Sequence, residues 1–280
     1  MTPFGARLHH AMAHRGPLCA GIDPHAALLG QWGLEDSVAG LESFALGATE
    51  ALAPHVAAVK PQSAFFERFG SRGVAVLERV VATAREAGAL VVLDVKRGDI
   101  GSTAQGYADA YLDPASPLAA DAITASPYLG FGSIGPMIET AHAHGAGVFV
   151  LALTSNPEAP EFQHARTAAG ASVAGSVLAS LATLNRGADP MGSFGAVVGA
   201  TIERTDEDLA INGPLLVPGV GAQGGTAEDV RRVFGAALPQ VLPSSSREIL
   251  GAGPDPARLR AAAQRTVAAF VALRDQMGES

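Results

Sequence analysis

One short stretch of the sequence groups ionisable side chains in a pattern that could move a proton. Asp94, Lys96 and Asp99 follow one another closely, and Gly98 allows the chain to turn between the last two. Residues two apart on a β-strand point to the same side, so Asp94 and Lys96 would share a face. Opposite charges favour the charged form of an ammonium, so Lys96 between two carboxylates would be held as a proton donor. A strand-end ion pair without chemistry is the alternative.

Two later loops have the composition of an anion-binding site. Residues 218–225 contain a Gly-x-Gly-x-x-Gly pattern, and residues 244–247 end in Ser246 and Arg247. A dinucleotide fold would place that glycine pattern after its first strand, so we reject an NAD site. Glycine lets backbone N–H groups approach a phosphate, and Arg247 adds a guanidinium. The two loops predict a phosphate site; a glycine-rich turn beside a surface arginine is the alternative.

Asp23 and Lys60 are single polar residues that each close a buried apolar run. A lysine at the mouth of a barrel must find a carboxylate or a ligand oxygen to offset its desolvation, which favours a functional Lys60. The alternative is a solvated loop position for either residue. The chain has 17 Arg but only two Lys, Lys60 and Lys96. Such a skew is typical of compositional drift, but it makes each lysine a position at which to ask why arginine would not serve.

The elements that would position these residues alternate along the whole chain. Short apolar runs are each followed by a polar turn and then by an Ala-rich stretch with helical spacing. Most runs are apolar on both faces and no linker divides the chain, which predicts a single-domain (β/α)₈ TIM barrel over residues 1–280. A doubly wound open sheet is the alternative. We expect strands at 18–23, 56–60, 90–96, 122–126, 148–153, 195–200, 215–217 and 240–243, and helices at 38–52, 73–87, 133–144, 168–184, 228–237 and 256–276.

Two segments of the chain do not fit the regular alternation of strands and helices. Residues 154–193 are too long for an ordinary strand-to-helix connection, so we expect an elaborated loop region there. Residues 1–16 are expected to form a short surface helix. The active site of such a barrel lies at the carboxyl ends of the strands. The polar residues that end the predicted strands are Asp23, Lys60, Asp94, Lys96, Ser126, Ser246 and Arg247.

Composition excludes several classes of function. The formal net charge of −8 argues against nucleic acid or an anionic membrane as the main partner. The single cysteine, Cys19, cannot form an intrachain disulfide, and no cysteine cluster suggests a metal site. No apolar run is long enough to span a membrane, and the N-terminus has no signal-peptide core. We therefore expect a cytoplasmic protein without a metal.

Taken in order along the chain, the strand-end motifs resemble those of the orotidine 5′-phosphate decarboxylase family. The resemblance runs from the first predicted strand to the eighth and implies a barrel that acts as a homodimer. It also implies conversion of orotidine 5′-monophosphate (OMP) to UMP and CO₂ in pyrimidine biosynthesis, without metal or organic cofactor. The motifs that carry it are 21–24, 59–61, 94–100 with Thr103, 126–127, 218–223 and 246–247.

The same resemblance implies a role for each matched residue. Lys96 would protonate C6 of the pyrimidine beside Asp94, and Lys60 would link Asp94 to the ribose hydroxyls. Asp99 and Thr103 would reach across the dimer interface, with Ile100 beside them. The remaining substrate-binding residues would be Asp23 for the ribose, Ser126 for the pyrimidine amide, and Gln223 and Arg247 for the phosphate, with Pro218, Gly219 and Ser246 on the same two loops.

The residue types suit that chemistry, and two rival functions remain. Loss of CO₂ leaves a carbanion-like C6, which a fixed ammonium would stabilise and then protonate. Arginine holds its proton too tightly for this task. One rival is a Mg²⁺-dependent sugar-phosphate enzyme, a 3-hexulose-6-phosphate synthase or a keto-gulonate phosphate decarboxylase, in which Lys60 would repel the metal. The other is a noncatalytic sugar-phosphate-binding barrel, which leaves the Asp94, Lys96 and Asp99 cluster unexplained.

Overall fold

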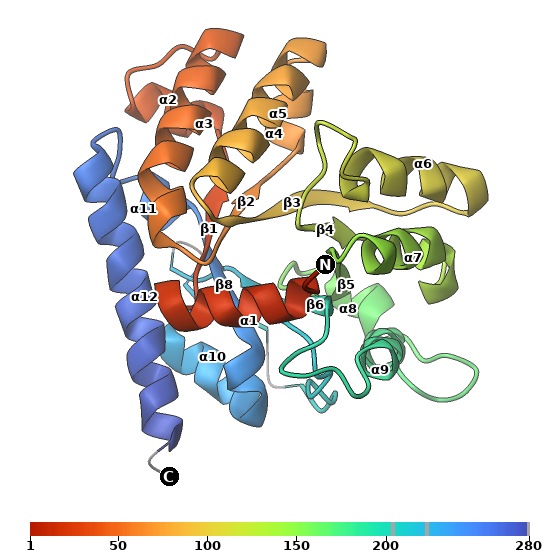
Figure 1. The fold of residues 1–280 in the computed structure, drawn as a ribbon. Helices are drawn as coiled ribbons and strands as arrows, with labels where there is room; N and C mark the ends of the chain where they lie inside the picture. The colour runs from red at the N-terminus through yellow and green to blue at the C-terminus, as the bar shows by residue number, and fades with distance from the viewer. Residues whose placement is uncertain (203–204, 222–223, 279–280) are drawn as a thin grey trace.

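Eight parallel strands close into a barrel in the order in which they occur along the chain, with helices around the outside (Figure 1). The computed structural model describes residues 1–202, 205–221 and 224–278. β1 pairs with both β2 and β8, which closes the barrel, so the predicted TIM barrel is confirmed and the open sheet is wrong. The strands are β1 Cys19–Ile22, β2 Ala58–Pro61, β3 Leu90–Arg97, β4 Ala122–Ala125, β5 Gly147–Leu153, β6 Phe194–Val198, β7 Leu215–Pro218 and β8 Val241–Ser245.

The strands are short and apolar because both of their faces are buried. On β4, for example, Ile123 and Ala125 pack outward against the helices, while Ala122 belongs to a separate cluster inside the barrel. The long outer helices include the six predicted regions and also α6, which the sequence analysis had not assigned. They are α3 Val38–Leu52, α5 Ser71–Glu86, α6 Gly101–Leu112, α7 Gly135–Ala143, α9 Val173–Leu184, α10 Ala227–Phe234 and α12 Pro256–Gly278.

Several shorter helical turns lie in the connections between these elements. Among them, α11 follows β8 directly and begins at Arg247. The short elements are α2 Ala26–Gln31, α4 Ala64–Glu67, α8 Ala159–Gln163, α11 Arg247–Leu250 and the 3₁₀ turns η1 Ala53–His55, η2 Phe131–Ile134 and η3 Gly235–Gln240.

The N-terminal helix α1, Phe4–Arg15, corrects the prediction of a surface helix (Figure 1). Phe4, Leu8 and Met12 repeat at the four-residue spacing of one helix face, and all three are buried. They pack with Cys19 and other side chains of the barrel interior in one apolar cluster. The helix therefore closes the amino-terminal end of the barrel.

The chain between β5 and β6 contains α8, an isolated antiparallel bridge between Arg166 and Ser172, and α9. The predicted helix at 168–184 begins only at Val173. Ser172 is its N-cap, and the Ser172 Oγ accepts the Gly175 N–H at 2.8 Å. Residues 168–171 lie in the turn between the two residues of the bridge and are therefore not helical.

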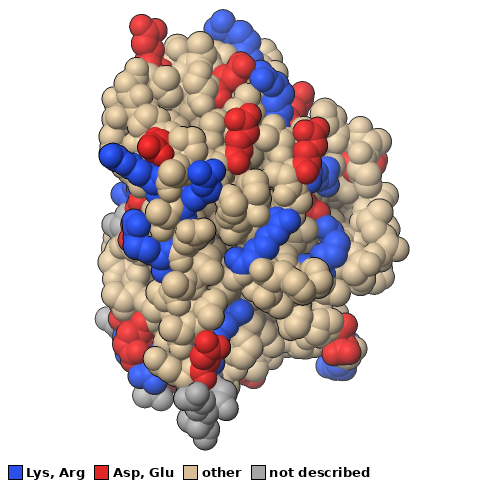
Figure 2. Space-filling view, turned by 60° about the vertical axis from the view of Figure 1, so that its left-hand side comes forward, with Lys and Arg blue, Asp and Glu red and all other residues tan. Residues whose placement is uncertain are grey.

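Charged side chains of both signs are interspersed over the face drawn in Figure 2. The net charge of −8 is therefore not gathered into a single patch on that face. Across the described ranges, no helix combines the length and the apolar character needed to cross a membrane.

Candidate active site

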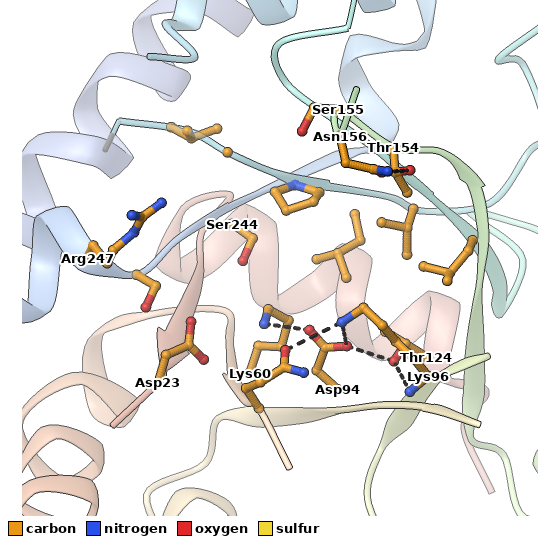
Figure 3. A pocket seen from close by; sticks show the side chains of 18 of the residues that line it. Asp23, Lys60, Asp94, Lys96, Thr124, Thr154, Ser155, Asn156, Ser244 and Arg247 are labelled. Atoms are coloured by element: carbon orange, nitrogen blue, oxygen red, sulfur yellow. Dashed lines mark hydrogen bonds and ion pairs between the residues drawn. The ribbon is translucent and has the colours of Figure 1, made fainter. Parts of the chain in front are cut away.

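A cavity of about 600 Å³ opens at the carboxyl ends of the barrel strands. Eight of the residues predicted from the sequence contribute to its wall, from β1, β2, β3, β7 and β8 or directly after them. Figure 3 shows the arrangement: Arg247 lies at one side, Lys96 at the other, and Asp23 and Lys60 between them. The eight residues are Asp23, Lys60, Asp94, Lys96, Pro218, Gly219, Ser246 and Arg247.

Two ammonium groups share one carboxylate at the bottom of the cavity. Lys60 Nζ donates to Asp94 Oδ2 at 2.8 Å, and Lys96 Nζ donates to Asp94 Oδ1 at 2.5 Å. Lys60 and Asp94 are buried, whereas 45% of the Lys96 side chain is exposed. Both lysines line the cavity, and Lys96 is the more exposed of the two cations.

Burial and charge act in opposite directions on this cluster. Burial alone would raise the pKa of Asp94, but the ammonium groups of Lys60 and Lys96 outweigh it and hold that pKa below its ordinary value. Burial alone would lower the pKa of Lys60, but the carboxylates of Asp94 and Asp23 raise it above its ordinary value. Both groups are therefore charged at neutral pH, as a fixed ion pair.

The backbone of Lys96 is in the left-handed region, with φ of 45°. A non-glycine residue there costs of order 1–3 kcal/mol and persists only where its surroundings hold it. The pairing of β3 with β4 shifts register between Leu93 and Arg97, and the Lys96 N–H donates to Thr124 Oγ1 at 2.9 Å. The strand end is thus distorted at the residue that faces the cavity.

Two polar side chains near Arg247 have buried atoms that lack a hydrogen-bond partner. Among the described residues, Asp23 Oδ1 and Ser246 Oγ are such atoms, and both residues line the cavity. Buried polar atoms in proteins are nearly always paired, so an unpaired atom beside a cavity needs an explanation. A ligand with hydroxyl or other polar groups would satisfy both.

The glycine-rich loop after β7 folds back on itself beside these residues. The Gly225 N–H donates to the Gly219 oxygen at 3.1 Å, and the Gly221 N–H donates to the Gly225 oxygen at 2.8 Å. Gly219 and Gly221 have φ of 97° and 78°, which favour glycine. The predicted phosphate-binding Gln223 lies outside the described residues.

Four predicted residues lie away from this wall. Ile100 and Thr103 are exposed, and Asp99 Oδ1 accepts the Ile100 N–H at 2.8 Å. Ser126 lines a separate cavity of about 110 Å³. The reason is local: β4 ends one residue earlier than predicted, and the Ser126 N–H donates to the Arg97 oxygen at 2.8 Å. Ser126 therefore lies beside the strand end that carries Lys96, but it lines the smaller cavity, which shares Leu151 with the larger one.

The cavity also contains polar residues that the sequence analysis missed. Thr154, Ser155 and Asn156 directly follow β5, so the strand-end rule applied to that strand would have found them. Gln62 follows Lys60 by two residues, and its Oε1 lies 3.4 Å from Lys96 Nζ. The other polar residues missed are His25 and Thr124, whereas Ser244 belongs to the predicted phosphate loop at 244–247. Across the described residues, no three His, Cys, Asp or Glu side chains gather as a metal-binding group.

The fold and the cavity define a (β/α)₈-barrel enzyme whose site is built at the carboxyl ends of the strands. The sequence profile of the "Orotidine 5′-phosphate decarboxylase / HUMPS family" matches residues 16–262, and the chain belongs to this family.

The chain is 72% identical over 253 residues to an orotidine 5′-phosphate decarboxylase of Nocardioides sp., covering 89% of this chain and 92% of the relative. It is 62% identical over 266 residues to the Streptomyces coelicolor enzyme of the same name, covering 95% and 96%. A solved structure titled a putative orotidine 5′-phosphate decarboxylase, from Streptomyces avermitilis, superposes with a TM-score of 0.96 at 60% identity. That superposition covers 98% of this chain and 96% of the other.

Proposed function

We propose that this protein decarboxylates OMP to UMP and CO₂ in pyrimidine biosynthesis. The observation that carries the proposal is the Lys60, Asp94 and Lys96 cluster at the bottom of the cavity, in a chain 72% identical to a relative of that name. Burying two cations against one carboxylate is energetically costly because the charges lose their hydration. The noncatalytic alternative offers no function that would explain this cost.

The order of groups along the cavity matches the order of groups in the substrate. Arg247 and the glycine-rich loop at one side would hold the phosphate, with backbone N–H groups and a guanidinium. Asp23, whose Oδ1 is unpaired, and Lys60 lie between and would bind the ribose hydroxyls. The pyrimidine would then lie beside Lys96, with C6 toward its ammonium.

The reaction needs one bond to break and one proton to arrive. The bond from C6 to the carboxylate carbon breaks, its electron pair stays on C6, and CO₂ leaves. The Lys96 ammonium stabilises the developing negative charge because it is already fixed 2.5 Å from Asp94 Oδ1, and it then donates a proton to C6. Solvent returns a proton to Lys96 through the open side of the cavity.

The polar residues after β5 offer the pyrimidine amide further partners beside Ser126. Thr154, Ser155 and Asn156 line the same cavity as Lys96, whereas Ser126 lines another. Figure 3 shows these three residues across the cavity from Asp94. We propose that the amide edge of the pyrimidine lies between Ser126 and the loop that begins at Thr154.

A Mg²⁺-dependent reaction is disfavoured by charge at this site. The carboxylate that a metal would need, Asp94, is already shared by Lys60 and Lys96. A divalent cation there would face two ammonium groups at close range, which is unfavourable in a buried site. We propose that the enzyme works without a metal or an organic cofactor.

Asp99, Ile100 and Thr103 support a homodimer in which each cavity takes residues from both chains. They follow Lys96 directly but lie outside the wall of their own cavity. Ile100, Tyr128 and Leu129 are large apolar side chains that are exposed in the single chain. Contiguous exposed apolar patches mark protein interfaces, and a dimer that covers these side chains would remove them from water. We propose that Asp99 and Thr103 complete the site of the partner subunit.

The reaction is tested by the loss of ultraviolet absorbance of OMP in protein treated with EDTA. We expect turnover without added metal and UMP as the product. No turnover, or turnover that returns only with Mg²⁺, contradicts the proposal.

The shared site is tested by mixing two inactive homodimers, Lys96→Ala and Asp99→Ala. After subunit exchange, one of the two sites in each mixed dimer has both residues intact, so activity should return. If exchange is demonstrated and activity does not return, Asp99 does not cross the interface.

A further inference from the structure

Thr124 lies inside the barrel, directly beside the charged cluster. Ala122, two residues earlier on β4, belongs to the apolar cluster of the barrel interior, and Thr124 points to the same side. Its side chain is part of the cavity wall, yet the residue is only 1% exposed. A hydroxyl in this position must be satisfied by neighbouring protein groups.

The Thr124 hydroxyl both accepts and donates a hydrogen bond. Its oxygen accepts the backbone N–H of Lys96 at 2.9 Å, and its proton is donated to Asp94 Oδ1 at 2.8 Å. The same Asp94 oxygen accepts from Lys96 Nζ at 2.5 Å. One hydroxyl therefore contacts the backbone of Lys96 and also the atom that anchors its ammonium (Figure 3).

The backbone contact matters because Lys96 has left the regular strand. Its φ of 45° is unfavourable for a side chain with a Cβ, and the pairing of β3 with β4 is shifted at this point. The N–H of Lys96 bonds to a side chain of β4 in place of a backbone oxygen. The direction of the Lys96 stem thus depends on the Thr124 oxygen.

We propose that Thr124 is a positioning residue, which fixes Lys96 for proton transfer by holding its backbone and its carboxylate anchor with one hydroxyl. This inference rests on the proposed function, in which Lys96 protonates C6. The lysine side chain is flexible and its ammonium can turn freely, so geometry must be imposed on it from outside. Thr124 imposes it without taking part in the transfer.

The test compares Thr124→Val, which keeps the shape and removes both hydrogen bonds, with Thr124→Ser, which keeps them. A displacement of a reacting group by about 1 Å can cost about 100-fold in rate, so we expect kcat of the valine variant to fall about 100-fold. The KM for OMP and the Kd for UMP should not change, because the phosphate and ribose contacts remain. The serine variant should keep kcat near that of the parent protein.

Exchange of the C6 hydrogen of UMP in D₂O, followed by NMR, gives a second readout. Removal of that proton is the reverse of the protonation step, and it does not involve the carboxylate group that OMP loses. Thr124→Val should slow the exchange by the same factor as it slows decarboxylation. A smaller folded fraction would also lower both rates equally, so each rate is divided by the concentration of sites that bind UMP.

Thr49→Val is the matched control, because Thr49 is a buried threonine on α3 whose Oγ1 donates to the Ala45 oxygen at 2.7 Å, outside the cavity. It should leave kcat and KM unchanged. Circular dichroism establishes that each variant is folded, and Thr124→Ala replaces the valine variant if that one is not.

Three results would overturn the inference: a valine variant as active as the parent, a serine variant as slow as the valine variant, or a fall in UMP affinity that matches the loss of activity. A parent protein that does not decarboxylate OMP would refute the proposed function as well. A parent that is active, with Lys96→Ala inactive and Thr124→Val active, refutes the role of Thr124 alone.

Discussion

The two ends of the barrel are built on opposite physical principles. At the amino-terminal end, Phe4 and Leu8 of α1 fill the interior, and the Phe4 ring meets Phe149 edge to face at a centroid distance of 5.9 Å. At the carboxyl end, the carboxylate of Asp94 holds the two ammonium groups of Lys60 and Lys96 close together. The first end gains free energy by excluding water, whereas the second keeps a charged cavity open.

The comparison shows that the amino-terminal end of the barrel stabilises the fold, whereas the carboxyl end contains a strained backbone. Apolar packing at the closed end needs no particular partner for each atom, and a close fit is sufficient. At the open end, the carboxylate of Asp94 has specific partners in Lys60, Lys96 and Thr124, and the left-handed Lys96 is tolerated because Thr124 holds it. Substitutions at the open end should therefore reduce activity, and substitutions at the closed end should reduce stability.

The largest effect is expected from Lys96→Ala. Loss of the proton donor should lower kcat/KM for OMP by about 10⁴-fold, the upper range for a general acid. Stability should change little, because Asp94 keeps its bonds to Lys60 and Thr124 and the lost side chain was half exposed. Steady-state kinetics and urea unfolding measure the two effects on the same sample.

Lys96→Arg is the matched control for charge. It keeps a cation near Asp94 but not an acid that releases a proton readily, so it should be nearly as slow as the alanine variant. An arginine variant with substantial activity would mean that charge alone carries the rate.

At the closed end, Phe4→Ala should have the opposite profile. Removing a fully buried phenylalanine costs about 3–5 kcal/mol in free energy of unfolding, from lost transfer energy and the cavity left behind. The folded fraction should retain the parent kcat, because the cluster at Asp94 is untouched. Urea unfolding gives the stability, and kinetics under native conditions give the rate.

His9→Ala supplies the comparison on the same helix, since His9 is exposed on the other face of α1. Its stability should match that of the parent protein. If Phe4→Ala is no less stable than His9→Ala, α1 does not close the barrel as described.

The same contrast explains which parts of the molecule the sequence could predict. Strand positions follow from local composition, because a short apolar run between polar turns can only be buried, and all eight predicted strands are present. The residues at the ends of those strands could be predicted for the same reason, which placed Lys60, Asp94 and Lys96 at one mouth.

The errors arose where the outcome depends on distant parts of the chain. Thr124 lies within a predicted strand, and only the pairing of β3 with β4 brings its hydroxyl to Lys96. Ser126 was predicted to be the last residue of its strand, but β4 ends at Ala125, and the contact of Ser126 with Arg97 was not visible in the sequence. The burial of Phe4 was signalled by four-residue spacing, but the surface that covers it is the barrel itself.

A smaller effect is expected at the rim of the open end. Arg247→Ala should lower kcat/KM for OMP by about 100-fold, since a hydrogen bond to a charged group contributes about 1.5–3 kcal/mol. Stability should not change, because Arg247 is exposed. Binding of UMP should weaken while binding of uridine, which lacks the phosphate, stays the same. Equal weakening of both ligands would remove Arg247 from the phosphate site.

The smallest effect is expected from Cys19, which lies between the two ends. Burial raises the pKa of its thiol to about 12. The unfolded thiol ionises near pH 8.5, so the contribution of Cys19 to stability is fully present below that pH and is lost as the pH rises toward the folded value. Between pH 8 and pH 9.5 this loss should be about 1 kcal/mol, by the linkage between proton binding and unfolding.

Urea unfolding of the parent protein and of Cys19→Ala at both pH values isolates the thiol, because every other titrating group is common to the two. Relative to Cys19→Ala, the parent protein should lose about 1 kcal/mol of unfolding free energy as the pH rises from 8 to 9.5. Ellman's reagent should leave the folded protein unlabelled at pH 8 and label it fully in urea, since the thiolate is the reactive form. Rapid labelling of the folded protein would mean that solvent reaches the barrel interior at Cys19, and the closed end would not be closed.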